Sequence, residues 1–238
     1  MAVTTSSNPN VGGKLLLLAQ HCGDSFPVWV GQDRVAVAEA LLAAHPDCNV
    51  LISNDGLQHH RLERDMEIIV IDFNEQSFGN GLILPAGPLR ESLKRFQSTD
   101  AIVVNGALNK QIDRLYSDKT FNMKLVSGTF YNFLNPDIHA IPAQLTVKRL
   151  HAVTDTNNEQ WFFDYLDRAR LNVAFHTFTE NHLFVEQDLQ YPNAEAILMP
   201  AEDAVKCREF ANETLWVLSV EAQVTGNLRE LILKRLST

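Results

Sequence analysis

Continuous apolar runs alternate along this chain with segments of helical periodicity. Apolar runs of about four to eight residues, bounded by polar or turn residues, are typical of parallel strands that are covered on both faces. Such runs predict strands at residues 27–31, 49–53, 66–73, 101–106, 150–154, 171–178, 194–200 and 214–220.

Helical periodicity fills most of the gaps between these strands. In QDRVAVAEALLAAHP (residues 32–46) the apolar side chains of Val35, Ala38, Leu41 and Leu42 share one helical face, and Pro46 ends the pattern. Further helices are predicted at residues 159–170, 185–192, 201–212 and 227–236, and a loop rich in Gly and Pro enters a helix near Leu89.

The pattern changes between residues 124 and 147. KLVSGTFYNFL (residues 124–134) alternates like an antiparallel ribbon, and AQLTVKRL (residues 143–150) is its expected partner. We therefore predict an α/β fold of two doubly wound α/β/α units, residues 14–123 and 148–238, with a β linker between them and a flexible arm over residues 1–13.

Composition narrows the class of protein. The chain has 238 residues, of which 45% are hydrophobic, and its formal net charge is −9, which disfavours a nucleic-acid partner. The apolar run Leu15–Leu18 is far shorter than the roughly 20 residues that span a bilayer, and we see no signal peptide. Three scattered cysteines favour a reducing compartment.

Ligands of doubly wound sheets bind at the carboxyl ends of the strands. Asn54, Asp55, Asp72 and Asn105 are predicted there. Asp55 precedes Gly56, which allows close approach of another backbone or a phosphate, so its carboxylate is a candidate Mg²⁺ ligand. The alternative is a turn aspartate that caps the next segment.

Two neighbouring segments add candidate binding residues. His59 and His60 are adjacent, so they cannot share a helical face as a metal pair, but one of them can orient a phosphate. The loop FGNGLILPAGPLRE (residues 78–91) presents backbone N–H groups and the Arg90 guanidinium to an anion. The alternative is a rigid connector in which Arg90 and Glu91 only pair with each other.

No stretch matches the P-loop pattern G-x-x-x-x-G-K-[ST]. The nearest, NPNVGGKLL, has Gly13 and Lys14 in place, but Asn8 stands where the first glycine belongs and Leu15 where the hydroxyl belongs.

Four long motifs together resemble the tetraacyldisaccharide 4'-kinase family. They are GQDRVAVAEALLAAHP, SNDGLQHHRLERDMEIIVID, FGNGLILPAGPLRES and DAIVVNG, and they occur in order over residues 14–106. Weaker similarity continues in LHAV, FFDYL, FTENHLF and DAVKC. The resemblance implies a P-loop-NTPase-like unit and a smaller C-terminal α/β unit. It also implies a kinase and transferase of lipid A biosynthesis, which uses Mg²⁺ and ATP to phosphorylate the 4'-position of the lipid A disaccharide precursor.

The resemblance also assigns roles to residues. Asn54 stands at the catalytic base and Asn181 at its partner histidine, with His182 one residue later, while Asp55 matches the metal-linked acid. Substrate-binding positions are Gln58, His59, Asn80, Gly81, Pro85, Gly87, Arg90 and Glu91. The family's A-G-I-G-N-P turn is TDTNNE here (residues 154–159), and its T-E-K-D is PAED, which keeps only Asp203.

These departures lead to three hypotheses. Family chains carry a membrane-associating helix, a strand and a P-loop before the first motif, and this sequence starts after them, so we expect the chain alone to bind neither ATP nor Mg²⁺ and to be weak or inactive as a kinase. The second hypothesis is a non-catalytic module that binds a lipid or a protein, and the third is a gene remnant.

The family resemblance implies a Gram-negative bacterium and a place in the cytoplasm, with peripheral contact at the inner membrane. The lipid A disaccharide precursor is the expected partner. An open sheet edge beside residues 49–53 or its neighbour is expected to promote self-association.

Overall fold

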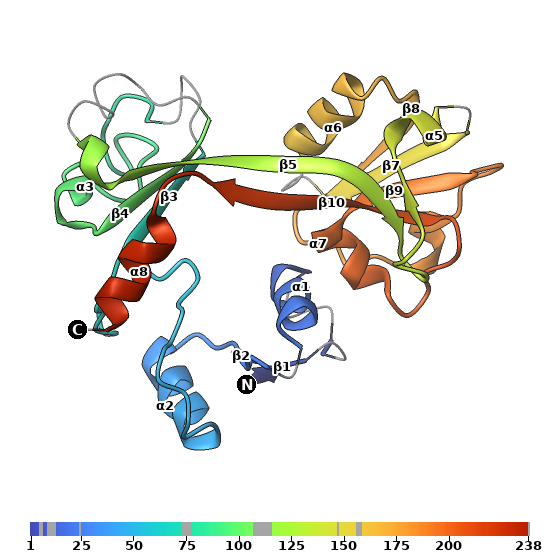
Figure 1. Ribbon diagram of the computed structural model, residues 1–238. Helices are drawn as coiled ribbons and strands as arrows, with labels where there is room; N and C mark the ends of the chain where they lie inside the picture. Colours follow the sequence, from blue (N-terminus) through green and yellow to red (C-terminus); the bar gives the residue numbers. More distant parts are fainter. Residues whose placement is uncertain are drawn as a thin grey trace. The chain divides into compact units, whose positions relative to one another are not determined.

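The computed structural model describes residues 1–4, 7–8, 13–23, 25–72, 78–106, 116–146, 148–155 and 159–237 (Figure 1). The chain folds as a mixed α/β protein with two units, each built from two separate stretches of sequence. The first unit holds residues 1–52 and 127–220, and the second holds residues 53–126 and 221–238. Strands β5 (Thr120–Asn132) and β10 (Leu215–Val224) therefore run through both units. The domain boundaries given above stay a prediction.

Parallel strands form the centre of the first unit. They are β7 (Leu150–Asp155), β8 (Val173–Phe178), β9 (Ala196–Pro200) and the start of β10, in the spatial order β10-β9-β7-β8. Their registers set Leu215 against Ile197 and Leu150 against Ala196 and Val173. All four strands were expected from their apolar runs, and the structure confirms them.

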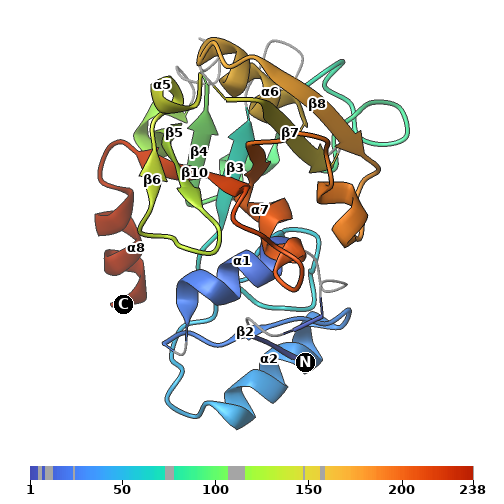
Figure 2. The same cartoon turned by 90° about the vertical axis from the view of Figure 1, so that its right-hand side faces the viewer.

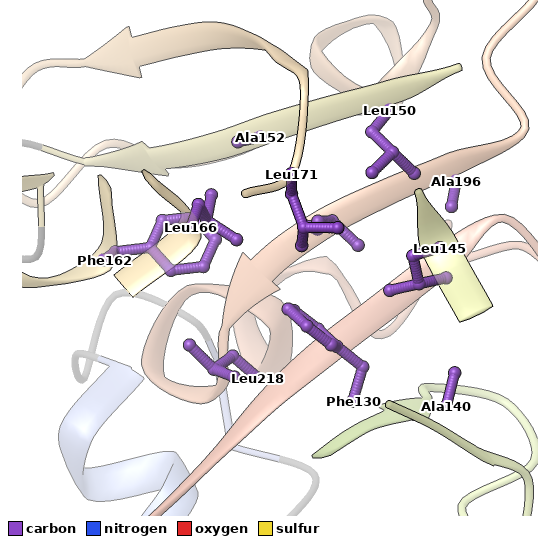
Figure 3. Packing of buried hydrophobic residues seen from close by; sticks show 11 residues of the cluster. Phe130, Ala140, Leu145, Leu150, Ala152, Phe162, Leu166, Leu171, Ala196 and Leu218 are labelled. Carbon is purple, nitrogen blue, oxygen red and sulfur yellow. The ribbon is translucent and has the colours of Figure 1, made fainter. Parts of the chain in front are cut away.

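Alternate residues of these strands fill two separate cores. On one face Leu150, Ala152 and Leu198 pack with Phe162 and Leu166 of α6 (Glu159–Arg168). Figure 3 labels four of these residues, Leu150, Ala152, Phe162 and Leu166. The other face holds a second buried cluster, built on Val153, Ile197, Met199, Leu215 and Val217 and covered by Phe184, Leu189, Ala204 and Cys207. Every residue of β9 is buried, as expected for a strand covered on both sides.

A helix and one strand of a small ribbon near the start of the sequence were not predicted, whereas the other strand of the ribbon lies within the strand expected at residues 27–31. Helix α1 (Gly13–Cys22) packs beside α7 (Ala201–Ala204), as Figure 2 shows. A β-carbon on Gly13 would lie 1.9 Å from the backbone oxygen of Glu202. Strand β1 (Ala2–Val3) pairs with β2 (Val28–Trp29), and Val3 is buried against α1. The sequence analysis assigned Ala2 and Val3 to a flexible arm and did not predict this strand, because a two-residue strand leaves no periodic signal.

The second predicted strand does not form. Helix α2 (Arg34–Ala44) begins as expected, with the Asp33 carboxylate accepting from the backbone N–H groups of Val35 and Ala36. Residues 49–53, however, are irregular, and Ile52 is 93% exposed. An apolar run shows that a strand is favourable, but a strand also requires a neighbour for its backbone hydrogen bonds.

The sheet strands of the second unit have one covered face. Strand β3 (Ile68–Asp72) pairs in parallel with β4 (Ala101–Asn105), which pairs with β5. Ile69 and Ile71 pack against Phe96 of α3 (Arg95–Ser98), whereas Val70 is 63% exposed. The expectation that both faces of β3 are covered was wrong, and β3 is an edge strand in the part of the sheet that the structure describes.

Other element boundaries differ from the predictions. The helix expected near Leu89 begins at Arg95, because residues 78–91 keep turn conformations. The partner of β5 is β6 (His139–Ala140), since residues 143–150 contribute instead to α5 (Pro142–Leu145) and the start of β7. The helices expected at 185–192 and 201–212 are short, with 3₁₀ turns η3 (Glu186–Leu189) and η4 (Val205–Cys207).

The remaining elements are η2 (Ser117–Lys119) and α8 (Leu228–Leu236). Among the residues placed by the structure, no helix has both the length and the apolar character needed to span a membrane.

Two histidines and a tyrosine form a stack on β7 and β8 in the first unit. His151 Nδ1 lies 2.9 Å from His176 Nε2, and the Tyr191 ring stacks on both imidazoles with centroid distances of 4.5 and 4.0 Å. Desolvation lowers the pKa of His151, and desolvation together with the His151 charge lowers the pKa of His176. Burial, assisted by Asp188, raises the pKa of Tyr191 to about 12.

This stack predicts a loss of stability in mild acid. A histidine whose pKa is lowered in the folded state stays neutral at a pH at which the same histidine in the unfolded chain is already protonated. The free energy of unfolding is therefore highest above about pH 6.5 and falls as the pH drops below that value. Thermal unfolding between pH 8 and 5 should show this fall. The double variant His151→Asn/His176→Asn should have a flatter pH dependence than the parent, whereas the exposed control His60→Asn should not. Equal slopes in all three proteins would contradict the prediction.

Candidate functional site

The turn that carries Asp55 is tightly folded. Asp55 has a φ of 52°, a left-handed conformation that aspartate tolerates better than most residues, and a β-carbon on Gly56 would lie 2.6 Å from Ser53 Oγ. Arg64, which the sequence analysis missed, donates from Nη1 to the backbone oxygens of Gly56 at 3.3 Å and Leu57 at 3.2 Å. Its guanidinium also pairs with Glu67 at 3.1 Å, so the turn is fixed to the chain that leads into β3.

Asp55 meets the loop of residues 78–91 through Arg90. Arg90 Nη1 lies 3.4 Å from both carboxylate oxygens of Asp55, and Arg90 Nη2 donates to Gln58 Oε1 at 2.9 Å. Gln58 Nε2 in turn donates to Glu91 Oε1 at 3.3 Å. Four predicted site residues from two separate motifs are therefore joined in one hydrogen-bonded cluster, which we call the Asp55–Arg90 cluster (Asp55, Gln58, Arg90 and Glu91).

This cluster lies open to solvent. The side chains of Arg90 and Asp55 are 60% and 65% exposed, so their ion pair contributes little to folding stability. Both groups thus keep their charge available for a ligand. Arg90 is engaged with Asp55 and Gln58, an arrangement different from the simple Arg90–Glu91 pair of the connector alternative.

The rest of the loop is shaped by its own side chains and glycines. Asn80 Nδ2 donates to the Ala86 oxygen at 2.8 Å, and Asn80 Oδ1 accepts from the Leu82 N–H at 3.1 Å. Gly81 has a φ of 75°, and a β-carbon on Gly87 would lie 2.1 Å from Asn80 Oδ1. The Leu84–Pro85 peptide is cis. The predicted residues Asn80, Gly81 and Gly87 therefore hold the loop in one shape.

The other predicted residues of the second unit lie at the surface. Asn54 is exposed, His59 is half-buried and His60 is exposed. Asp72 and Asn105 lie at the carboxyl ends of β3 and β4 as predicted, and Asn105 Nδ2 donates to Asp72 Oδ1 at 3.0 Å. The same prediction for Asn54 and Asp55 was wrong, because the residues before them form no strand.

Asn181 and His182 lie in the first unit on the segment after β8. Asn181 is exposed with a φ of 57°, whereas His182 Nε2 lies 2.8 Å from Asp188 Oδ2 and its ring stacks on Phe178 at 4.5 Å. Asp188 also accepts from the Val185 N–H at 2.9 Å. His182 is thus held by a carboxylate that the sequence analysis missed, although the capping position of Asp188 at η3 offered a signal.

A buried ion network in the first unit joins the TDTNNE segment to the PAED segment through Lys206. Lys206 Nζ lies 3.0 Å from Asp155 Oδ2 and 2.8 Å from Asp203 Oδ1. Thr154 Oγ1 and the Asp155 N–H donate to Asp203 Oδ2 at 2.8 and 3.2 Å. Residues 156–158 of the TDTNNE segment lie outside the described residues.

Charges in this network are strongly coupled. Burial alone would lower the pKa of Lys206, but the neighbouring carboxylates of Asp203 and Asp155 outweigh it and the pKa is raised. Burial also raises the pKa of Glu202 and of the Cys207 thiol. Within this network the sequence analysis missed Lys206, because a lysine in a predicted amphipathic helix is expected to be exposed.

The described side chains hold no cluster of three or more His, Cys, Asp and Glu residues suited to a metal ion. Asp55 is a single carboxylate, and the Arg90 guanidinium competes for its oxygens. A magnesium ion at Asp55 would need further oxygen ligands, such as substrate phosphates.

The protein is therefore of the α/β class and has a parallel-rich sheet. Residues of two of its motifs gather around the Asp55 carboxylate and the Arg90 guanidinium. Comparison with known proteins narrows this class. The family model for tetraacyldisaccharide-1-P 4'-kinase matches residues 1–237. The chain belongs to this family, as its four motifs indicated.

Two relatives illustrate the similarity. The tetraacyldisaccharide 4'-kinases of Nitrosomonas europaea and Nitrosomonas eutropha are both 44% identical to this chain, over 98% and 99% of its length. The chain spans only 59% and 60% of their own lengths. A crystal structure of apo-form LpxK from Aquifex aeolicus in complex with ATP shares the fold, with a TM-score of 0.75 and 21% identity over 99% of this chain and 74% of that one.

The loop geometry predicts a strong effect of Gly87→Ala. The new methyl group would overlap Asn80 Oδ1 and the Leu82 oxygen, so the loop must open at a cost of about 1–3 kcal/mol. Limited proteolysis between residues 78 and 91 and urea unfolding would measure this. Gly128→Ala is the matched control, because its added β-carbon meets nothing within 4 Å. Equal protease resistance of both variants would show that the loop is not held as described.

The ion network predicts that Lys206→Met is strongly destabilising. The substitution leaves two buried carboxylates without their ammonium, which typically costs about 3–5 kcal/mol. Urea unfolding would measure the loss, and Lys124→Met at an exposed position is the control. The double variant Asp155→Asn/Lys206→Met should regain part of the stability. A loss in Lys206→Met no larger than that of the control would refute the prediction.

Proposed function

We propose that this chain acts in lipid A biosynthesis as a member of the tetraacyldisaccharide 4'-kinases whose own phosphate transfer is weak or absent. One observation carries the substrate side of this proposal, namely the Asp55–Arg90 cluster. It brings Asp55 of the SNDG motif together with Arg90 and Glu91 of the loop motif. An exposed guanidinium beside amide donors suits a phosphorylated sugar.

The weakness that we propose lies in proton transfer. Phosphorylation of the 4'-hydroxyl requires a group that accepts its proton, and a carboxylate can do so whereas the amide of Asn54 cannot. Asn181 stands where the family places the histidine that tunes this base. Its exposed amide carries no titratable proton, so it cannot replace an imidazole.

Asp55 is the residue that would hold magnesium, and Arg90 would then have to release it. When bound, Mg²⁺ with ATP supplies the phosphoryl group and neutralises its charge. We place the chain at the cytoplasmic face of the inner membrane of a Gram-negative bacterium, with the lipid A disaccharide precursor as its ligand. We also interpret the fold as the family's two doubly wound α/β/α units joined by a β linker, the first being the nucleotide-kinase unit.

Reversion of both asparagines tests the catalytic part. The chain would be combined with a fragment of the Nitrosomonas europaea relative that carries the portion of that protein outside the match. Transfer of labelled phosphate from ATP to the lipid is then measured. General-base catalysis is typically worth about 10²- to 10⁴-fold, so Asn54→Asp/Asn181→His should exceed the unmodified assembly by at least roughly 10²-fold.

Each single variant and a control sharpen this assay. Asn54→Asp should give most of the gain, because it restores the proton acceptor, and Asn181→His alone should give little. Asn227→Asp is the control, an exposed asparagine of the second unit outside every motif. If the unmodified assembly is already as fast as the double revertant, the interpretation of both asparagines is wrong.

A second candidate is a binding module without catalysis. It is favoured by the same cluster, in which the binding residues of both motifs remain joined while Asn54 occupies the base position. In that case the chain binds the disaccharide lipid, and neither asparagine reversion produces phosphate transfer. A chain that fails to fold would instead indicate a gene remnant.

A further inference from the structure

A second contact joins the two segments that carry the Asp55–Arg90 cluster. Glu67 Oε1 lies 3.1 Å from Arg64 Nε and also pairs with Arg95 Nη2. One carboxylate oxygen of Glu67 therefore holds two guanidinium groups. We call this group the Glu67 clamp (Arg64, Glu67 and Arg95), and all three residues belong to the second unit.

Arg64 connects the clamp to the turn that carries Asp55. Its Nη1 donates to the backbone oxygens of Gly56 and Leu57, which follow Asp55 directly, at 3.3 and 3.2 Å. A guanidinium that contacts two carbonyl oxygens and a carboxylate fixes the position and the orientation of the chain that it holds. The turn is therefore tied to the carboxylate at the centre of the clamp.

Arg95 connects the clamp to the loop of residues 78–91. Arg95 begins α3, and its N–H donates at 2.8 Å to the oxygen of Ser92, the residue that follows the loop. The next residue, Phe96, is buried and contacts the ring of Phe78 at the other end of the loop, with the ring centroids 6.0 Å apart. Both ends of the loop are therefore attached to the helix that Arg95 begins.

Glu67 is shielded from water to a much greater extent than the cluster. The Glu67 side chain is 13% exposed, whereas those of Arg90 and Asp55 are 60% and 65% exposed. The Glu67 backbone is also fixed, because its N–H donates to Asp100 Oδ2 at 2.8 Å and its carbonyl oxygen accepts from the Asp100 N–H at 3.0 Å. Since water screens an exposed ion pair far more than a shielded one, the clamp holds the two segments together more firmly than the Asp55–Arg90 pair does.

We propose that Glu67 is a positioning residue of the candidate site, which sets the spacing of Asp55 and Arg90 by holding the turn to the loop. Two charged groups on separate segments present a fixed pattern to a ligand only when those segments keep their distance. The inference deepens the proposed function and rests on it for the identity of the ligand, tetraacyldisaccharide 1-phosphate. The alternative is an ion pair that only stabilises the unit, and its loss would loosen the whole unit rather than the turn and the loop.

Hydrogen exchange without any ligand tests the clamp. Glu67→Gln keeps the shape of the side chain but removes its charge, so amide exchange at residues 56–62 and 81–89 should become about tenfold faster. Residues 101–105 of β4 should exchange as in the parent. Glu63→Gln is the matched control, since it removes an exposed carboxylate that has no ion pair in the described part of the chain, and it should exchange like the parent throughout. Unchanged exchange at both segments in Glu67→Gln, or an equal acceleration in β4 or in the control, would overturn the proposal.

Ligand affinity gives a second readout, which general stability does not imitate. Binding of tetraacyldisaccharide 1-phosphate in detergent micelles should weaken at least about fivefold in Glu67→Gln and in Arg95→Met, whereas Arg95→Lys, which keeps an ion pair with Glu67, should lose much less. Adding Glu67→Gln to Arg64→Met/Arg95→Met should cause no further loss, because the clamp is already open. Losses that simply add would contradict the proposal. If the parent does not bind this lipid, the proposed ligand is wrong, and hydrogen exchange alone decides whether the clamp holds the two segments.

Discussion

The structure depends on the pairing of two strands that belong to both units. Within the first unit, the Phe133 N–H donates to the Leu215 oxygen at 2.9 Å, and within the second unit the Thr225 N–H donates to the Asn122 oxygen at 2.8 Å. These bonds lie at opposite ends of β5 and β10, so the two strands run antiparallel (Figure 1). The parallel strands of each unit are then added to them, β9 to β10 and β4 to β5.

Periodicity predicted the parts of the fold that bury both faces. The runs that became β7, β9 and β10 are continuous because each lies between two apolar cores, and that requirement is visible in the sequence. The run at residues 49–53 looks the same but remains irregular, since backbone hydrogen bonds to a neighbour are a property of the whole sheet. Short elements such as β1 and β6 depend on a partner far along the chain, which a local pattern cannot reveal.

The sequence motifs pointed to most residues of the candidate site, and the contacts in the structure revealed the residues that support them. Asp55, Gln58, Arg90 and Glu91 were identified from sequence, and the structure joins them. Arg64, Asp188 and Lys206 were not identified, because a supporting residue has no fixed spacing from the residue that it holds. The roles of the two asparagines at the base and histidine positions come from the resemblance alone, and no distance in the structure assigns them.

The buried network of the first unit has a consequence for ligand selectivity. Asp155 ends β7 and Asp203 follows β9, so both carboxylates occupy the kind of strand end at which α/β proteins commonly receive phosphates. The two carboxylates and the single ammonium give this strand end a net negative charge. An incoming phosphate would compete with Asp155 and Asp203 for Lys206 and would be repelled by both, so this end of the sheet is electrostatically closed to anions. An anion site at this strand end would therefore require the loss of one of these two carboxylates, so that Lys206 could pair with the anion.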